Sequence, residues 1–151
     1  PIRYVFIFRN IFLCNLTIPV SINPINDQPF HLVTHLPQMT VVEGENRTIT
    51  RNDLLTEDAD TPPEEIIYDV MSGPTLGVLR KITNDGRPED LLAFSNQFTQ
   101  ADINNDRIIY VHFGMPQSTT FCFTVSDGQS NPAYEIFTIK IDSIHLQPSA
   151  L

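Results

Sequence analysis

Apolar and polar residues alternate along short stretches of this chain, and turn-forming residues separate the stretches. The alternation is clearest in LTIPVSI (16–22) and FTIKIDS (137–143). A period of two places the apolar residues on one face of a β-strand. Residues 51–56 and 89–107 fit strands poorly, and short helical turns are expected there. Further strands are predicted at 39–42, 47–50, 66–71, 76–82, 108–113 and 120–126.

The two stretches also resemble each other. Their alignment gives a constant offset of 121 residues (137 minus 16), which is typical of a tandem repeat. On this interpretation residues 16–29 are the last strand of a preceding repeat and its linker. Residues 30–143 are one nearly complete repeat, and 144–151 begin the downstream linker. About seven short strands in one repeat predict an all-β fold, an antiparallel β-sandwich.

Residues 1–15 do not fit the repeat and are interpreted as an uncertain tail of misassigned or foreign sequence. At the same offset they lie against 122–136, yet nothing in them resembles the VSDG segment at 125–128. Their apolar runs at 4–8 and 11–14 are far shorter than the roughly 20 residues of a membrane-spanning helix. No direct membrane insertion is therefore expected from this segment.

Composition narrows the function classes. Hydrophobic residues make up 41% of the 151 residues, which is enough for a core, and the formal net charge is −9. This charge repels phosphate backbones, so nucleic acid is excluded as a partner. Half of the 18 acidic residues lie between Glu43 and Asp69, where only Arg47 and Arg51 oppose them. Such a cluster is either a solvated loop or the place where a cation binds.

Several ordered motifs carry a family resemblance. They resemble successive pieces of a chondroitin sulfate proteoglycan repeat, and among proteins built from such repeats the chain is most similar to the Fras/Frem family of extracellular matrix proteins. The motifs are NPINDQP (23–29), VVEGENRTIT (41–50), LLTEDADTPPEEIIYDV (54–70), GVL (77–79), FTQADINNDRIIYVHFG (98–114) and FTVSDG (123–128).

The resemblance implies a cadherin-like Greek-key β-sandwich of about seven strands, arrayed in tandem. The parent protein would be a large secreted or cell-surface protein of basement membranes, extracellular, working in epithelial–mesenchymal adhesion. Its implied partners are extracellular matrix or cell-surface proteins and the neighbouring repeats of the same chain.

The resemblance also points to calcium, which takes six to eight oxygen ligands. NPINDQP resembles the inter-repeat linker of cadherins, and EDAD (57–60) resembles their Asp-x-Asp turn. The acidic residue after the strand at 39–42 is placed like the one near the first cadherin strand. The hypothesis is a Ca²⁺ site that stiffens the joint between repeats, built from Asn26, Asp27, Glu43, Asp58 and Asp60.

A purely structural role for these residues stays open. The Asn-Asp pair before Pro29 also suits an Asx turn, and the two aspartates of EDAD also suit a loop cap. The segment ADINNDR (101–107) lacks the Gly and the terminal Glu of an EF-hand, so it is interpreted as a polar turn into the next strand. The downstream segment 141–151 lacks an Asn-Asp pair, which leaves a cation site at that joint in doubt.

One glycosylation sequon stands out, Asn46-Arg47-Thr48. It follows the turn at Gly44, so we expect Asn46 to be exposed and, in a secreted chain, modified. The second sequon, at Asn15, lies in or beside the tail and is discounted.

Catalysis is not expected, because the sequence holds no nucleophile motif and no phosphate-binding loop. His31 and His35 have helical zinc spacing but lie in a linker-like segment. His112 is interpreted as a hydrogen-bonded core or edge histidine, and Cys122 as a packed strand residue.

Two function classes follow. The first is a structural and adhesive module of an extracellular array. The second is a ligand-binding sandwich for a growth factor, collagen or glycan, and an exposed apolar patch on one sheet face would favour it. A sulfated glycan is disfavoured by the net negative charge.

Overall fold

The computed structural model describes residues 29–144. Asn26, Asp27, the tail 1–15 and the predicted strand at 16–22 lie outside the described residues. Within 29–144 the chain forms short strands and two brief helices, α2 (Leu91–Phe94) and α3 (Gln100–Asn104). The strands are β1 (His31–Leu32), β2 (Gln38–Val42), β3 (Asn46–Thr48), β4 (Thr56–Glu57), β5 (Ile67–Ser72), β6 (Gly77–Ile82), β7 (Pro88–Asp90), β8 (Gln97–Thr99), β9 (Ile108–His112), β10 (Thr119–Ser126) and β11 (Ala133–Asp142).

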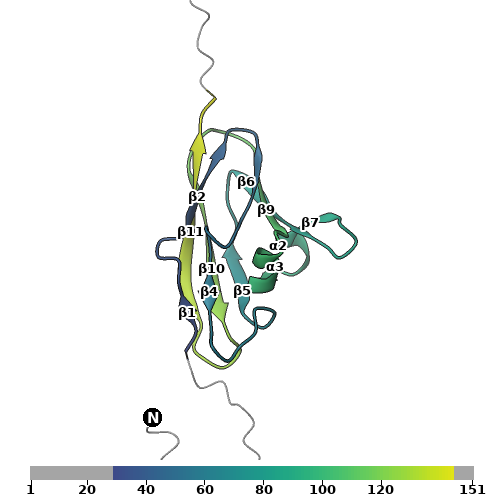
Figure 1. The fold of residues 1–151 in the computed structure, drawn as a ribbon. Helices are drawn as coiled ribbons and strands as arrows, with labels where there is room; N and C mark the ends of the chain where they lie inside the picture. Colours follow the sequence, from purple (N-terminus) through teal and green to yellow (C-terminus); the bar gives the residue numbers. More distant parts are fainter. Residues whose placement is uncertain (1–28, 145–151) are drawn as a thin grey trace, which may run out of the picture.

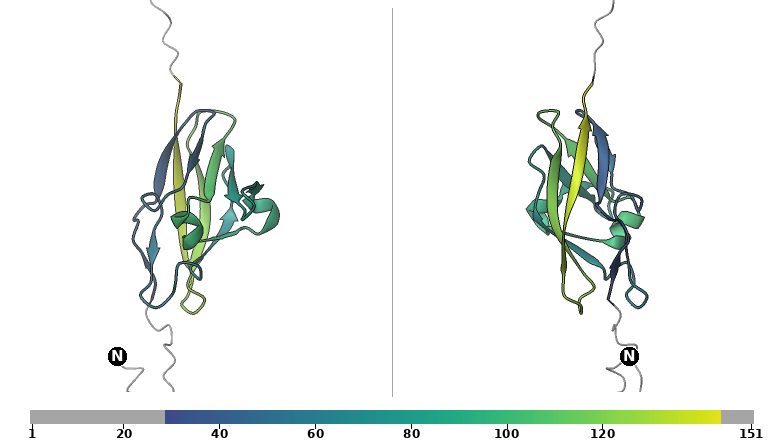
Figure 2. Two further views of the ribbon diagram at one scale, coloured as in Figure 1. Left: turned by 45° about the vertical axis from the view of Figure 1, so that its right-hand side comes forward. Right: turned by 90° about the vertical axis from the view of Figure 1, so that its left-hand side faces the viewer.

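Two sheets face each other as the layers of a sandwich (Figure 2). One has the strand order β2-β11-β10-β5-β8 and the other β3-β9-β6-β7, while β1 and β4 form a separate small pair. In the right-hand view of Figure 2, β11 lies between β10 and β2. The β6–β7 hairpin projects sideways from the sandwich together with α2 (Figure 1). The predicted all-β sandwich is therefore confirmed.

The core follows from the alternation. Every second residue of β10 is buried, and the same pattern continues in β9 and in the middle of β11. Phe121 and Phe137 face each other across β10 and β11 with ring centroids 4.9 Å apart, and Tyr68 stacks on Phe98 at the same separation. Aromatic pairs at this distance add to the hydrophobic stabilisation of the interior.

The seven longer predicted strands are present within one or two residues, apart from β11, which begins four residues earlier. Two features differ from the expectation. Strands of two or three residues, β1, β4, β7 and β8, are added at the edges. The pairing of β2 with β11 is parallel, whereas every other pair is antiparallel among the described strands. Parallel neighbours need a long connection, and the whole repeat supplies it here.

The expected helical turns are also found. Residues 89–107 contain α2 and α3 with β8 between them. In the segment 51–56 the amides of Asp53 and Leu54 both donate to Thr50 O, at 2.9 and 3.0 Å, which closes a single turn. The helix α3 begins with a capping box between Thr99 and Asp102. No helix within the described residues is long and apolar enough to cross a bilayer.

The parallel β2–β11 pair decides where the described chain begins and ends. Because the first long strand and the last one run in the same direction, residue 29 lies at one end of the sandwich and residue 144 at the opposite end (Figure 1). These are called below the upstream end and the downstream end.

Candidate functional site

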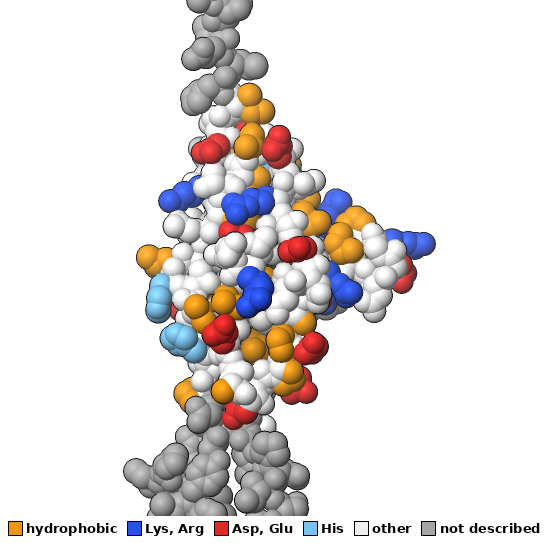
Figure 3. Space-filling view, in the orientation of Figure 1, with side chains coloured by type: hydrophobic (Ala, Val, Ile, Leu, Met, Phe, Trp, Pro, Cys, Tyr) orange, Lys and Arg blue, Asp and Glu red, His pale blue; other side chains and the backbone are white. Residues whose placement is uncertain are grey.

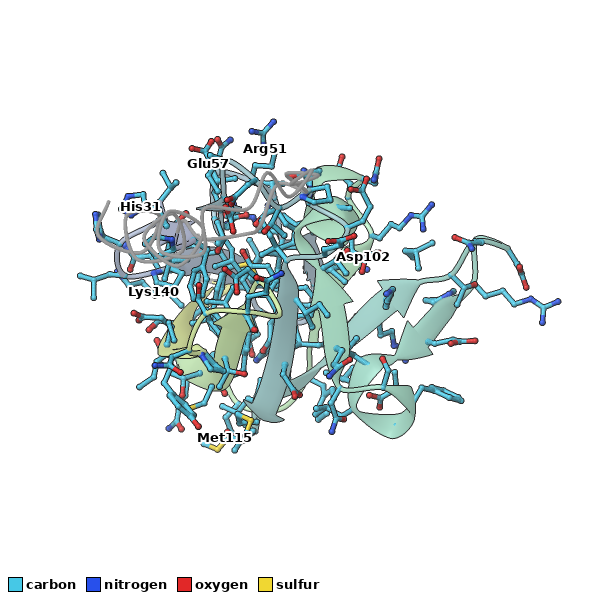
Figure 4. The ribbon with its side chains drawn as sticks, turned by 90° about the horizontal axis from the view of Figure 1, so that it is seen from below. His31, Arg51, Glu57, Asp102, Met115 and Lys140 are labelled. Atoms are coloured by element: carbon cyan, nitrogen blue, oxygen red, sulfur yellow. The ribbon has the colours of Figure 1, made fainter. Side chains whose placement is uncertain are left out.

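The upstream end holds the predicted Asp-x-Asp turn. The strand β4 pairs with β1, with His31 opposite Glu57, so the residues that follow β4 lie beside the start of the described chain. Asp58 and Pro29 line the same shallow hollow of about 540 Å³. Figure 4 views this end from below and shows His31, Glu57 and Arg51 along one side of it. The turn is therefore adjacent to Pro29, where the described part of the chain begins.

The structure brings Asp58 and Asp60 together in one turn. The amide of Asp60 donates to Asp58 Oδ1 at 3.2 Å, which is an Asx turn. This agrees with the loop-capping interpretation of Asp58. The second oxygen, Asp58 Oδ2, is buried and has no hydrogen-bond partner within the described residues, and Asp60 Oδ1 is buried as well.

A buried carboxylate oxygen without a donor costs free energy, because its hydration is lost and nothing replaces it. A divalent cation bound by carboxylate and carbonyl oxygens removes that cost. The Asp58–Asp60 turn thus fits a hard cation chemically. Within residues 29–144 the structure contains no cluster of three or more His, Cys, Asp or Glu side chains able to hold a metal. Further ligands would be backbone or side-chain amide carbonyls, water, or side chains from outside this range.

The structure does not bring Glu43 together with Asp58 and Asp60. Glu43 follows β2 at the downstream end, where its amide donates to Asp142 O at 2.9 Å. Its carboxylate oxygen Oε2 accepts from the amide of Ile144 at 3.3 Å. The physical reason is that β2 carries the chain along the sandwich, so Glu43 lies at the opposite end from the EDAD turn (Figure 1).

His112 organises the same downstream end. Its side chain is 3% exposed. Nδ1 accepts from the amide of Gly44 at 2.8 Å, and Nε2 lies 3.0 Å from Met115 O, to which it donates as the protonated nitrogen. The interpretation of His112 as a hydrogen-bonded core histidine is confirmed, and its hydrogen bonds fix the turn that carries Glu43.

The segment ADINNDR is part of a structural motif. Asp102 Oδ2 accepts from the amide of Thr99 at 2.9 Å and pairs with Lys81 Nζ at 2.8 Å. Through these two contacts the carboxylate of Asp102 caps the start of α3 and links this helix to β6. The polar turn predicted before the strand β9 is thus a one-turn helix followed by a tight turn.

Sequence reasoning missed a groove on the outer face of the five-stranded sheet. Its volume is about 720 Å³, and Tyr134 and Met71 in it are 75% and 59% exposed. The half-buried thiol of Cys122, which is free, lies between them, opposite Ile136 in the register. The sequence of β11 does indicate this groove, because the apolar residues Tyr134 and Ile136 alternate with the buried Phe137 and so face outward.

The sequon residue Asn46 is exposed, as expected. It is the first residue of β3, which is one of the two edge strands of the four-stranded sheet.

Comparison with known proteins places this geometry in a family. A cadherin-like family model matches residues 31–141. The chain is 34% identical over 121 residues, 80% of its length, to the human (Homo sapiens) extracellular matrix organizing protein FRAS1. It is 30% identical over 134 residues, 81% of its length, to extracellular matrix protein 3 of Lytechinus variegatus.

Human chondroitin sulfate proteoglycan 4 is 28% identical over 113 residues, or 75% of this chain. The chain spans only 3 to 5% of the length of these relatives. The chain belongs to the cadherin-like family, as a repeat of the type found in chondroitin sulfate proteoglycan and Fras/Frem proteins.

Proposed function

We propose that the chain is a non-catalytic structural and adhesive repeat of a large extracellular matrix or cell-surface protein, in which calcium stiffens the joint with the upstream repeat. The parent protein works outside the cell and supports epithelial–mesenchymal adhesion at the basement membrane. Its relatives are named as extracellular matrix proteins, which supports this role. Neighbouring repeats of the same chain are the first partners of such a module.

The position of the two ends carries the proposal. A chain that enters one end of a sandwich and leaves at the other extends an array along the sandwich axis (Figure 1). The ten residues of β11 span about 33 Å at the rise of an antiparallel strand, so each repeat adds at least about that length. Small-angle X-ray scattering on recombinant segments of the parent protein with one, two and three repeats tests this. The largest dimension should grow by a similar step with each repeat, and a compact three-repeat particle would contradict it.

Calcium is proposed at the upstream joint, with Asp58 and Asp60 from the turn and Asn26 and Asp27 from the linker. The buried, unpartnered Oδ2 of Asp58 supports this ligand set. Glu43 belongs to the downstream joint by its position and is assigned to no ligand set with Asp58. When bound, the ion would supply positive charge beside these carboxylates. Ligands from both the turn and the linker would join the two segments through the ion.

Calorimetry and thermal unfolding of the whole chain test the calcium site. Extracellular calcium modules bind with Kd of about 0.1–1 mM. At 10 mM Ca²⁺ a Kd of about 1 mM would stabilise the fold by about 1.4 kcal/mol. Asp58→Asn should abolish this gain, whereas Asp85→Asn in the exposed β6–β7 turn should leave it unchanged. If the unsubstituted chain shows no binding heat and its Tm does not change on addition of Ca²⁺, the site is excluded.

Ligand binding is a second candidate function, favoured by the apolar groove on the five-stranded sheet. Among the ligand classes considered, collagen or a growth factor suits an apolar groove better than a sulfated glycan, which the −9 charge repels. Surface binding to immobilised collagen tests it. Tyr134→Ser should weaken binding at least several-fold, while Lys140→Ser on the same strand should not. Equal binding by both variants would exclude the groove.

A further inference from the structure

The sequon at Asn46 lies in a defined row of side chains on the four-stranded sheet. Asn46 pairs with Val111 of β9, and Val111 pairs in turn with Val78 of β6. Directly opposed residues of antiparallel strands have their side chains on the same face. Tyr110, the residue before Val111, is fully buried, so the row Asn46–Val111–Val78 faces outward.

Apolar side chains lie beside Asn46 on the outward face. Val78 and Val111 are half-buried, as is Ile109 in the next row, where it pairs with Thr48 of the sequon and, on its other side, with the exposed Arg80 of β6. Both residues that the sequon requires, the asparagine and the threonine, therefore border an aliphatic strip. The edge position of β3 leaves the asparagine accessible, since its second side has no neighbouring strand among the described residues.

We infer that Asn46 carries an N-linked glycan whose first sugars lie on Val111 and Val78 and cover this strip. In the secretory pathway the side-chain amide nitrogen of Asn46 forms a bond to the anomeric carbon of a lipid-diphosphate-linked oligosaccharide. The bond from that carbon to phosphate breaks, the amide loses one proton, and the lipid diphosphate leaves. The C–H face and N-acetyl methyl of the first sugar then contact the valine methyl groups and remove apolar surface from water.

The two sheets then differ in their outer surfaces. Sugar covers the strip beside Asn46 on the four-stranded sheet, whereas the groove around Tyr134 on the five-stranded sheet stays open. The inference does not depend on calcium, because Asn46 and the Asp58–Asp60 turn belong to different parts of the fold.

Occupancy is tested on the whole chain secreted from animal cells, with Asn15→Gln in every sample so that one sequon remains. Mass spectrometry after enzymatic release of the glycan in heavy-oxygen water marks a modified asparagine by its conversion to labelled aspartate. We expect the label at Asn46, its loss in Asn46→Gln, and its retention in Thr48→Ser, which keeps the hydroxyl that the sequon needs. Folded, secreted chain without a label at Asn46 would overturn the inference.

The location of the sugar is tested separately. Removal of the glycan should lower the Tm of the secreted chain, and Val111→Thr should abolish that difference. Cys122→Ser, an equally small change on the outer face of the other sheet, should preserve it. If Val111→Thr fails to fold, nuclear Overhauser effects between the N-acetyl methyl and the Val78 or Val111 methyl groups serve instead. A glycan that changes no Tm and shows no such effect projects into solvent, and the inference is wrong.

Discussion

A buried network at the upstream end joins Tyr68 to Thr56 and Gln100. The Tyr68 hydroxyl lies 2.6 Å from Thr56 Oγ1 and 2.6 Å from Gln100 Oε1, and the amide of Thr56 donates to the same Gln100 oxygen at 2.9 Å. All three residues are at most 1% exposed. The network therefore ties β4 and α3 to the strand β5.

Removal of one hydroxyl from this network should be costly, and removal of both should cost less than the sum. Tyr68→Phe leaves the Thr56 hydroxyl and Gln100 Oε1 each with one partner fewer, and a buried polar group that loses its partner costs about 1–3 kcal/mol. Gln100 keeps its bond from the Thr56 amide, so we expect about 2 kcal/mol for Tyr68→Phe. Thr56→Val preserves the shape and should cost about 1–2 kcal/mol. The double variant should cost about 1 kcal/mol less than the sum of the two, because neither hydroxyl is then left unpaired.

Urea unfolding of the four proteins measures these differences. The chain has no Trp, so far-UV circular dichroism is the appropriate signal. For a domain of about 100 residues, 1 kcal/mol corresponds to roughly 4 °C in Tm, which gives an independent check by heating. Tyr134→Phe, at a ring that is 75% exposed, is the control and should stay within about 0.5 kcal/mol of the parent. Strict additivity of the two changes would refute the assignment of a shared network.

Three further outcomes are expected. Gly77→Ala should lower the free energy of unfolding in urea by about 1–3 kcal/mol, because φ is 149° and the added Cβ would lie 2.5 Å from the Tyr110 ring. Gly86→Ala is the control and should cost less, because no atom lies within 4 Å of its added Cβ. Burial raises the pKa of Tyr110 to about 12, above the value near 10 of unfolded tyrosine, so the stability that the protonated Tyr110 contributes is fully present below pH 10 and is lost as the pH rises from 10 to 12. Melting at stepwise pH should show this loss, and a flat profile would contradict it. Lys81→Met should lower the Tm by a few degrees, since it removes the ammonium group 2.8 Å from the buried Asp102 carboxylate, and an unchanged Tm would mean that the pair adds nothing.

The strands could be predicted because alternation is a local signal. In β10 the residues Phe121, Phe123 and Val125 are buried at every second position, so seven or eight residues suffice to define the strand and its inner face. The parallel contact of β2 with β11 could not be predicted in this way. It joins segments about a hundred residues apart, and nothing in the period of either strand encodes its neighbour. The bulge in β5 opposite Cys122 and Phe123 could not be predicted either, because it depends on how β5 pairs with β10 and not on the period of one strand.

The candidate site was predictable only in part. The turn at Asp58 and Asp60 is local, and an aspartate followed two residues later by the amide that it binds is a recognisable Asx signature. The grouping of Glu43 with that turn followed from proximity in sequence and from likeness to cadherins. Asp58 follows Glu43 by fifteen positions (58 minus 43), yet Glu43 lies at the downstream end and Asp58 at the upstream end, because the chain crosses the sandwich between them. A short distance in sequence therefore does not imply a short distance in space in this fold.

This separation changes the meaning of the acidic cluster. Five of its nine acidic residues lie at the two ends of the fold, with Glu57, Asp58 and Asp60 at the upstream end and Glu43 and Glu45 at the downstream end. Figure 3 shows acidic and hydrophobic side chains together at the end where the described chain leaves. In an array of repeats with the same distribution, the downstream end of one repeat would face the upstream end of the next, and like charges closer than the Debye length of about 8 Å at physiological salt would repel each other. The repulsion favours a bent or separated joint unless a cation neutralises it. A divalent ion at Asp58 and Asp60, as proposed, would reduce both the cost of the buried Asp58 oxygen and the repulsion between neighbouring ends, whereas added monovalent salt would relieve only the repulsion.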